Sequence, residues 1–353
     1  MAAMTEAYDL TCVIHVHSTY SDGTGTVPEI ARAAAKAGVD VVLLTDHDTL
    51  EAKRRGEEGW YGDVLVLVGE EVSPTDRDHF LAFGIDKEIN RRLSGPELCR
   101  AVADAGGFGF AAHPFSRGSQ RFRRPGIPFG ELDFVEGVEL WSFLNDTGER
   151  VQGFADLARM IVTPQKAIGN PPEDNVRQWE QLCASRRVVA VGGLDAHQFG
   201  LRIAGRVPLK LMSYKRSFRQ LHTHVMCDGA PTRELDHDRA LVYDALRRGR
   251  CYIAVDALAP AHGFAFWADG PAGELPMGGE ARAGPGWTAH VRTPRPARIR
   301  LVRDGEVIAR TEGDSLDHAI EREGVLRTEV ELLNRTWIFS NPCYFRPPAR
   351  VYS

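Results

Sequence analysis

The sequence His15-Val16-His17-Ser18-Thr19-Tyr20-Ser21-Asp22-Gly23 decides the fold, and it begins within the short apolar run Thr11–His17. Because side chains alternate along a β-strand, His15 and His17 point to the same side and can bind one metal ion. Taken alone, two such histidines are more often hydrogen-bonded core residues than ligands. The following turn adds the carboxylate of Asp22, so this stretch predicts a strand that presents metal ligands at its end.

Further strand-sized apolar runs end in ionisable residues in the same way. Charge at the end of an apolar strand is costly to bury without a purpose, and it lies where a barrel has its mouth. A helix cap explains Thr49, but it does not explain Asp46-His47-Asp48 before it. The other ionisable ends are Glu70-Glu71, His79 (which returns to Glu71 if its run forms a hairpin), His113 and Asp195-Ala196-His197. Half of the 12 histidines lie at these junctions, which a shared metal centre explains.

Seven apolar runs alternate with helical or loop segments between residues 11 and 193. Such alternation favours a parallel α/β construction, and seven strands without an obvious edge favour a barrel. The runs are Thr11–His17, Val39–Thr45, Val64–Val72, His79–Ile85, Phe108–His113, Phe134–Trp141 and Val188–Gly193. The predicted helices are Pro28–Ala37, Ser94–Gly107 with Ser94 as its N-cap, Gly148–Ile161, Glu173–Arg186 and Asp236–Arg250.

The pattern changes beyond about residue 257. After a short strand expected at Cys251–Val255, helical periodicity nearly disappears, and Gly and Pro separate short alternating runs. Examples are Trp287–Arg292, Arg298–Val302 and Leu326–Leu332. This pattern is typical of a small β-sandwich. We therefore predict two domains, residues 1–256 and residues 257–353.

Several motifs occur in the order that the PHP (polymerase and histidinol phosphatase) superfamily shows. They are H-x-H-S-x-x-S-D-G, T-D-H-D-T, G-x-E-V-S with a histidine before the next apolar strand, H-P and D-A-H. The resemblance spans residues 12 to about 197 and is specific, because five separated motifs agree. Ala245–Arg250 and Trp337–Pro342 are similar, less specifically, to the PHP subgroup with an appended β-sandwich, which includes carbaryl-hydrolase-like metallohydrolases. The resemblance implies a distorted seven-stranded β/α barrel followed by a small C-terminal β-sandwich.

The resemblance also implies ligands for two or three divalent transition metals. One ion would be bound by His15, His17, Glu71 and Asp195, a second by Glu71, His79 and His113, and a third by Asp22, His47 and His197. Glu71 and Asp195 would be catalytic because they hold the metals that bind the nucleophilic hydroxide. Glu70 is the rival of Glu71, and the family spacing favours Glu71. His222 and His224 form a further same-face pair that we expect to be structural.

The donor set and its charge indicate the chemistry. Imidazole and carboxylate ligands suit Mn²⁺, Zn²⁺ or Fe and exclude a calcium site. Three divalent ions outweigh the carboxylates of Asp22, Glu71 and Asp195, so the centre stays positive and attracts an anionic group. A hydroxide shared by two metals can attack a phosphoryl group, and the sequence contains no nucleophile elbow and no P-loop. We therefore expect a phosphoesterase that hydrolyses a small phosphomonoester or nucleotide.

Four arginines lie within residues 117–124, directly after His113-Pro114. Guanidinium groups match phosphate oxygens, although basic runs as often face solvent. Arg117, nearest to His113, is the first candidate for a substrate contact, and Arg202, shortly after His197, is the second.

Two other functions stay open. The same hydroxide can attack a carbonyl, and the β-sandwich subgroup contains such activity, so a carboxylic ester or carbamate hydrolase is the alternative. A non-catalytic or editing module associated with a polymerase ranks last, because the ligand set is complete and the sequence contains no polymerase-sized remainder.

Composition limits the partners and the location. A formal net charge of -5 gives no global attraction to nucleic acid or to an anionic membrane. The longest apolar runs are too short to span a bilayer, and Met1–Leu10 lacks the features of a secretory signal. The six cysteines are scattered without a C-x-x-C pair, which favours free thiols in a reducing cytoplasm. The oligomeric state is left open.

Overall fold

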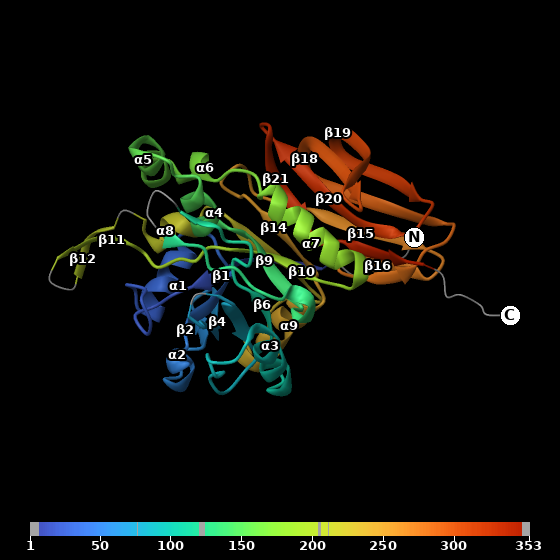
Figure 1. Ribbon diagram of the computed structural model, residues 1–353. Coiled ribbons are helices and arrows are strands. Elements are labelled where there is room, and N and C mark those ends of the chain that lie inside the picture. The colour runs from blue at the N-terminus through green and yellow to red at the C-terminus, as the bar shows by residue number, and fades with distance from the viewer. Residues whose placement is uncertain (1–6, 76, 120–123, 204–205, 211, 348–353) are drawn as a thin grey trace.

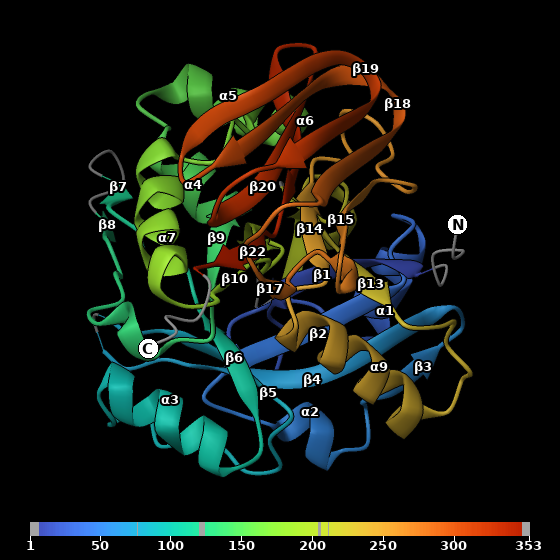
Figure 2. The ribbon, with the colours of Figure 1, turned by 90° about the vertical axis from the view of Figure 1, so that its right-hand side faces the viewer.

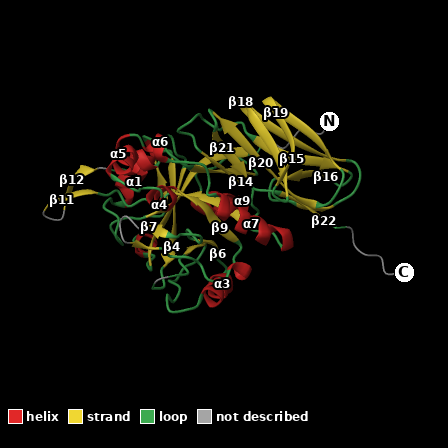
Figure 3. Cartoon of the chain, turned by 45° about the horizontal axis from the view of Figure 1, so that its top comes forward, coloured by secondary structure: helices red, strands yellow, loops and turns green. Residues whose placement is uncertain are grey.

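The computed structural model describes residues 7–75, 77–119, 124–203, 206–210 and 212–347 (Figure 1). It confirms a mixed α/β fold with a large sheet and a C-terminal part rich in strands. Figure 3 shows helices gathered around the N-terminal part, whereas the region from β15 to β22 consists of strands and loops. All six cysteines are free, as predicted.

Each of the seven predicted runs overlaps a strand. These strands are β1 (Tyr8–Val16), β2 (Val41–His47), β4 (Val64–Val72), β5 (Phe80–Phe83), β6 (Phe108–Ala111), β9 (Gly137–Ser142) and β10 (Val189–Gly193). They pair in this order, in parallel except for β5, which is antiparallel to β4 and β6. After β10 the chain returns to β1, where Leu194 N donates to Ile14 O at 2.9 Å and Ala196 N donates to His15 O at 3.0 Å.

Alternate residues of these strands belong to two apolar clusters. Val41 and Leu43 of β2 pack with Leu65 and Leu67 of β4 in an inner cluster, to which helix α9 (Leu235–Arg247) also contributes. The residues between them, such as Val42, belong to an outer cluster that includes residues of the helices. The position of a residue in this alternation therefore decides whether its side chain faces the inside or the outside of the ring of strands that runs from β1 to β10.

Several helices begin close to their predicted starts. α1 (Val27–Ala35) and α3 (Gly95–Asp104) each follow a capping box, and Ser94 donates to Glu97 Oε2 at 2.7 Å. The predicted helix Gly148–Ile161 is instead two helices, α4 (Phe143–Glu149) and α5 (Phe154–Val162), because Gly153 is extended. The remaining helices are α2 (Glu51–Arg54), η1 (Leu132–Phe134), α6 (Pro164–Ala167), α7 (Glu173–Ser185) and α8 (Tyr214–Ser217).

Short strands extend the N-terminal part. β3 (Gly59–Tyr61) pairs with β4, and β13 (His222–Cys227), which the sequence analysis does not predict as a strand, pairs antiparallel with β1. Two small hairpins join β7 (Gly118–Ser119) to β8 (Arg124–Pro125) and β11 (Gly200–Ile203) to β12 (Arg206–Lys210). β14 (Cys251–Ala254) pairs with β13.

The C-terminal strands surround an apolar cluster of their own. They are β15 (Ala265–Gly270), β16 (Gly273–Pro276), β17 (Glu280–Arg282), β18 (Trp287–Arg303), β19 (Glu306–Ile320), β20 (Gly324–Leu332), β21 (Arg335–Ser340) and β22 (Cys343–Arg346). The predicted runs Trp287–Arg292 and Arg298–Val302 are the two halves of β18, which pair with β15 and β20 respectively. Because β14 pairs with both β13 and β21, hydrogen bonding continues from one part into the other (Figure 2). The boundary at residue 257 therefore stays a prediction.

In the part of the chain that the structure describes, no helix combines the length and the apolar character needed to cross a membrane.

The buried side chain of Asn341 ties the two parts together, and its loss should be costly. Its Oδ1 accepts from Ala190 N, and its Nδ2 donates to Ala190 O and Cys251 O, each at 2.8 Å. Asn341→Ala leaves these buried groups without their partner, so the free energy of unfolding should fall by about 2–5 kcal/mol in a denaturant titration. Asn90→Ala is the control, because Asn90 is exposed, and it should cost less than about 1 kcal/mol. Equal losses would contradict this role of Asn341.

Candidate metal centre

The nine ligands predicted from the sequence come together in three overlapping groups. In the first group, Glu71 Oε2 lies 3.1 Å from His15 Nε2 and 3.3 Å from His17 Nε2. Asp195 Oδ1 lies 3.3 Å from each of the same two nitrogens. In the second group, Glu71 Oε1 lies 2.8 Å from His79 Nδ1 and 3.4 Å from His113 Nε2. Glu71 is thus common to both groups.

The third group contains Asp22, His47 and His197, and His17 joins it as well. Asp22 Oδ1 lies 3.0 Å from His197 Nε2 and 3.7 Å from His47 Nε2. His17 therefore stands between two groups, whereas the sequence analysis assigned it to one. The side chain of Asp22 is 59% exposed and that of Glu71 is 1% exposed, so the third group forms the solvent side of the centre.

The orientation of His15 and His17 depends on a backbone irregularity. Cys12 and Ile14 belong to the inner cluster, so unbroken alternation would point both histidines outward with Val13. The register with β2 shifts between Ile14 and Val16, and His15 has a φ of 67°. This bulge turns both imidazoles inward. His113 and Asp195 also have positive φ, at 31° and 51°. Strained backbone of this kind is concentrated at functional sites.

Asp46 binds the two serines of the first motif, Ser18 and Ser21. Its carboxylate accepts hydrogen bonds from Ser18 N at 2.7 Å, Ser18 Oγ at 2.6 Å and Ser21 Oγ at 2.6 Å. These bonds hold the loop that carries Asp22. Gly23 fits the same loop because a Cβ there would lie 2.2 Å from His17 O.

Glu70 and Glu71 point to opposite sides of β4. Glu71 has the parity of Leu65 and Leu67 and enters the centre, whereas Glu70 Oε1 accepts from Ile89 N at 2.7 Å. Burial raises the pKa of Glu70 to about 7, while the histidines around Glu71 outweigh its burial and hold its pKa well below the usual value. Only Glu71 is therefore placed to act as a shared anionic ligand.

Two residues that the sequence analysis missed orient the predicted ligands. Glu139 of β9 is buried, and its Oε2 lies 3.1 Å from His15 Nδ1 and accepts from His113 N at 2.7 Å. Asn145 of α4 donates from Nδ2 to Asp195 Oδ2 at 3.0 Å. A carboxylate on the far nitrogen of a metal-binding histidine sets its tautomer and orientation. The signal in the sequence was weak, because the apolar run Phe134–Trp141 contains two glutamates, Glu136 and Glu139, and nothing local distinguishes them.

The electrostatics of the centre reflect its crowded carboxylates and imidazoles. Burial would lower the pKa of His15, but Glu71, Glu139 and Asp195 raise it well above its usual value. Partial burial would lower the pKa of His197, whose side chain is 17% exposed, but Asp195 and Asp22 raise it to about 9. His17 behaves in the opposite way, because burial lowers its pKa to about 4. Protons and cations therefore compete for the same nitrogens.

The residues fit bound metal ions. Buried atoms at the middle of the centre, including His15 Nε2, both ring nitrogens of His17 and Glu71 Oε2, have no hydrogen-bond partner among the described residues. Leaving buried polar atoms unpaired is costly, and a shared cation satisfies all of them at once. The donor set of imidazoles and carboxylates suits Zn²⁺, Mn²⁺ or Fe.

The predicted substrate arginines are less well defined. Arg117 is exposed, and its guanidinium pairs with Asp174 of α7 while its backbone N donates to Glu149 Oε1 at 2.6 Å. Arg202 lies in β11, but its side chain is outside the described residues, as are the side chains of Arg121, Arg123 and Arg124. Their role as substrate contacts stays a prediction.

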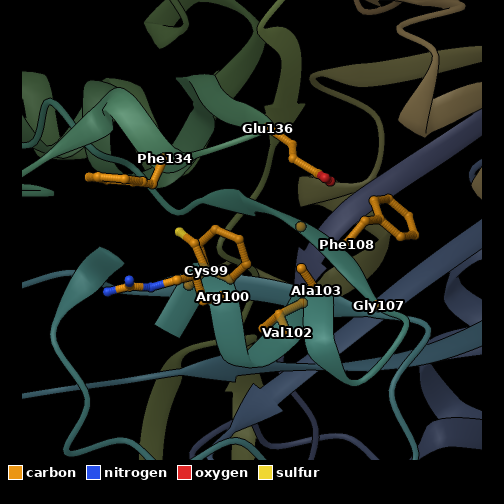
Figure 4. A pocket seen from close by; sticks show the side chains of 10 residues that line it. Cys99, Arg100, Val102, Ala103, Gly107, Phe108, Phe134 and Glu136 are labelled. Carbon is orange, nitrogen blue, oxygen red and sulfur yellow. The ribbon is translucent and has the colours of Figure 1, made fainter. Parts of the chain in front are cut away.

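A separate pocket of about 130 Å³ lies beside α3 and β6 (Figure 4). Phe80, Cys99, Val102 and Phe108 are among its lining residues, and burial raises the pKa of the Cys99 thiol to about 12. Its described lining includes none of the nine predicted ligands, so it is not part of the centre.

Comparison with known families agrees with this arrangement. Residues 14–144 match the model of the PHP domain, and this segment contains seven of the nine predicted ligands. The chain contains a PHP domain. Asp195 and His197 lie beyond the matched segment but within the same cluster as the PHP residues.

Individual relatives are more distant. An uncharacterized protein of Methanocaldococcus jannaschii is 29% identical over 150 residues, which cover 38% of this chain and 83% of that protein. A phosphoribosyl 1,2-cyclic phosphate 1,2-diphosphodiesterase of Eggerthella lenta is 36% identical over 80 residues, which cover 21% of this chain and 30% of that enzyme. A two-domain protein of Bacteroides vulgatus, described as containing a predicted PHP-like metal-dependent phosphoesterase, superposes with a TM-score of 0.46 and 16% identity over 96% of each chain.

Exchanging the two adjacent glutamates separately should give unequal effects. Glu71→Gln removes the charge shared by two ligand groups, so metal content should fall and hydrolysis should drop by more than about a hundredfold. Glu70→Gln keeps the acceptor for Ile89 N and should change activity by less than about threefold. Metal analysis and steady-state rates of both variants measure this difference. If Glu70→Gln were the more damaging change, the register of this motif would be misread by one residue.

Glu139→Gln should weaken metal binding without unfolding the protein. The amide can still accept one hydrogen bond, but it lacks the charge that orients His15 and supports the His113 backbone. Loss of such a partner typically lowers metal affinity by about 10–100-fold, which a competition titration with a chelating dye measures. Glu136→Gln, an exposed change three residues earlier, is the control and should bind metal like the wild type. Equal affinities in all three proteins would show that Glu139 has no part in positioning the ligands.

Proposed function

We propose that the protein is a phosphoesterase that hydrolyses a small phosphomonoester or a nucleotide at the PHP metal centre. The PHP domain and its cluster of imidazoles and carboxylates identify a metal-dependent hydrolase. The observation that carries the proposal is the convergence of the nine candidate ligand side chains in three overlapping groups, with unpaired buried atoms at their middle.

Charge supports an anionic substrate. Three divalent ions would bring six positive charges against the carboxylates of Asp22, Glu71 and Asp195. The structure adds Glu139 beside His15, so the surplus is smaller by one charge than the sequence alone indicates. The centre still remains positive with neutral imidazoles, and a phosphoryl group complements it.

The chain's own residues define the direction of approach. Asp22, His47 and His197 lie on the exposed side, so the substrate enters there, while Glu71 and His15 form the buried floor. Glu139 and Asn145 hold His15 and Asp195 in place from behind. When bound, divalent ions supply Lewis acidity and lower the pKa of coordinated water. Glu71 and Asp195 are the residues that we assign to catalysis through this role.

The finer assignments belong to the same proposal. Two or three ions of Mn, Zn or Fe would occupy the centre, and the ring of seven strands would be the distorted PHP barrel with the β-sandwich subgroup's C-terminal part. Arg117 is proposed as a substrate contact, since an exposed ion pair such as that with Asp174 is weak and leaves the guanidinium available to an anion. Arg202 is the second such candidate.

A substrate screen tests the reaction class. Purified protein supplied in parallel with Mn²⁺, Zn²⁺ or Fe²⁺ should release phosphate from at least one phosphomonoester or nucleotide, and Glu71→Gln should abolish that release. Naphthyl acetate and a naphthyl carbamate test the alternative of carbonyl hydrolysis. Turnover of these neutral compounds together with no phosphate release from any phosphorylated substrate would overturn the proposal in favour of an ester or carbamate hydrolase.

A further inference from the structure

A second group of metal-ligating side chains lies outside the PHP centre. His222 and His224 of β13 face Asp256, which follows β14 by two residues. Val225 and Cys227 of β13 belong to the inner cluster, so by alternation His224 and His222 point out of the ring. The strands thus separate this group from the PHP centre. From the sequence alone we expect the pair to be structural, but its surroundings point to a ligand role.

Three donor atoms converge in this group. Asp256 Oδ2 lies 2.7 Å from His222 Nδ1 and 3.0 Å from His224 Nε2, and the three atoms all lie within 4.8 Å of one another. Two histidines and one carboxylate are a common set for Zn²⁺ and Fe²⁺. The side chains of His222 and His224 are 4% and 0% exposed, and that of Asp256 is 16% exposed.

Each of these residues is held from behind by its other polar atom. His222 Nε2 contacts Phe218 O, and His224 Nδ1 lies 2.8 Å from Asp9 Oδ1. Asp256 Oδ1 accepts a hydrogen bond from Ala261 N at 2.9 Å. Metal-binding histidines almost always donate their second ring N–H to a carbonyl or a carboxylate in this way.

The surroundings of the two rings favour a cation. All four ring nitrogens of His222 and His224 face oxygen atoms. The carboxylates of Asp9 and Asp256 bring two negative charges to this group, and one divalent ion would balance both of them.

We propose that His222 Nδ1, His224 Nε2 and Asp256 Oδ2 bind one divalent transition-metal ion, separate from those of the PHP centre. Water completes its coordination, and the partly exposed Asp256 and the half-exposed His262, whose Nδ1 lies 3.3 Å from Asp9 Oδ2, leave a path to solvent. The ion joins β13 to the segment that leads into the C-terminal strands. Its role is structural, and the proposal does not depend on phosphoesterase activity.

Metal stoichiometry tests this site. The wild type and each variant are loaded with Zn²⁺, desalted and assayed for zinc per chain by mass spectrometry. His222→Gln and Asp256→Asn should each hold one equivalent less than the wild type. His237→Gln, which changes an exposed histidine of α9, is the matched control and should hold as much zinc as the wild type.

A double variant distinguishes the loss of this site from a loss of metal in the PHP centre. Glu71→Gln lowers zinc in the PHP centre, and adding His222→Gln to it should remove one further equivalent. In crystals of the zinc-loaded wild type, an anomalous peak should lie among His222, His224 and Asp256, which answers the question even if a variant fails to fold. Equal zinc content with and without His222→Gln, or no anomalous peak there, overturns the second site and leaves the proposed function untouched.

Discussion

The arrangement of the N-terminal part depends on one buried anion. The carboxylate of Glu71 is 1% exposed and lies within 3.4 Å of imidazole nitrogens of five histidines, which are His15, His17, His47, His79 and His113. These histidines come from the ends of β1, β2, β5 and β6. Burying a lone carboxylate is costly, so the strand ends must meet in one register to surround it. The antiparallel β5 is what returns His79 to Glu71, since Glu71 pairs with Leu81 across the two strands.

The sequence predicts those residues of the centre that neighbouring residues in the chain identify, and it misses those whose role depends on a distant strand. The nine candidate ligands could be predicted because apolar runs rarely end in histidines and carboxylates without a function. The choice of Glu71 over Glu70 came from the spacing of the PHP motif, because Val64–Val68 is apolar at every position and does not show which side of the strand faces inward. Glu139 and Asn145 are different. Their role depends on which side chain of a distant strand lies opposite them, and that is tertiary information.

The fold shows the same division between local and distant signals. The capping residues Thr26 and Ser94 mark the starts of α1 and α3 because the cap lies within the first turn. The strand β13 and the continuous β18 could not be predicted in the same way. β13 is stabilised by pairing with β1 and β14, and the two halves of β18 are joined through a shared partner, β19. The bulge at His15 belongs to this class too, since regular alternation would point both histidines the wrong way.

Strand β1 connects the two metal-ligating groups. Its end carries His15 and His17 into the PHP centre, while Asp9 near its start reaches His224 and Tyr252 on the outer side. β1 and β13 are paired from Tyr8 to Cys12. The contacts around His222, His224 and Asp256 therefore fix the register of β1 before the bulge at His15 begins. A strand anchored in this way can keep a positive φ at His15 without a shift in register. A shift of one residue would break the Asp9 contacts and move every side chain of β1 to the opposite face of the sheet. The group of His222, His224 and Asp256 therefore affects the geometry of the PHP centre through the backbone of β1. Among the residues that the structure describes, no side chain of one group contacts a side chain of the other.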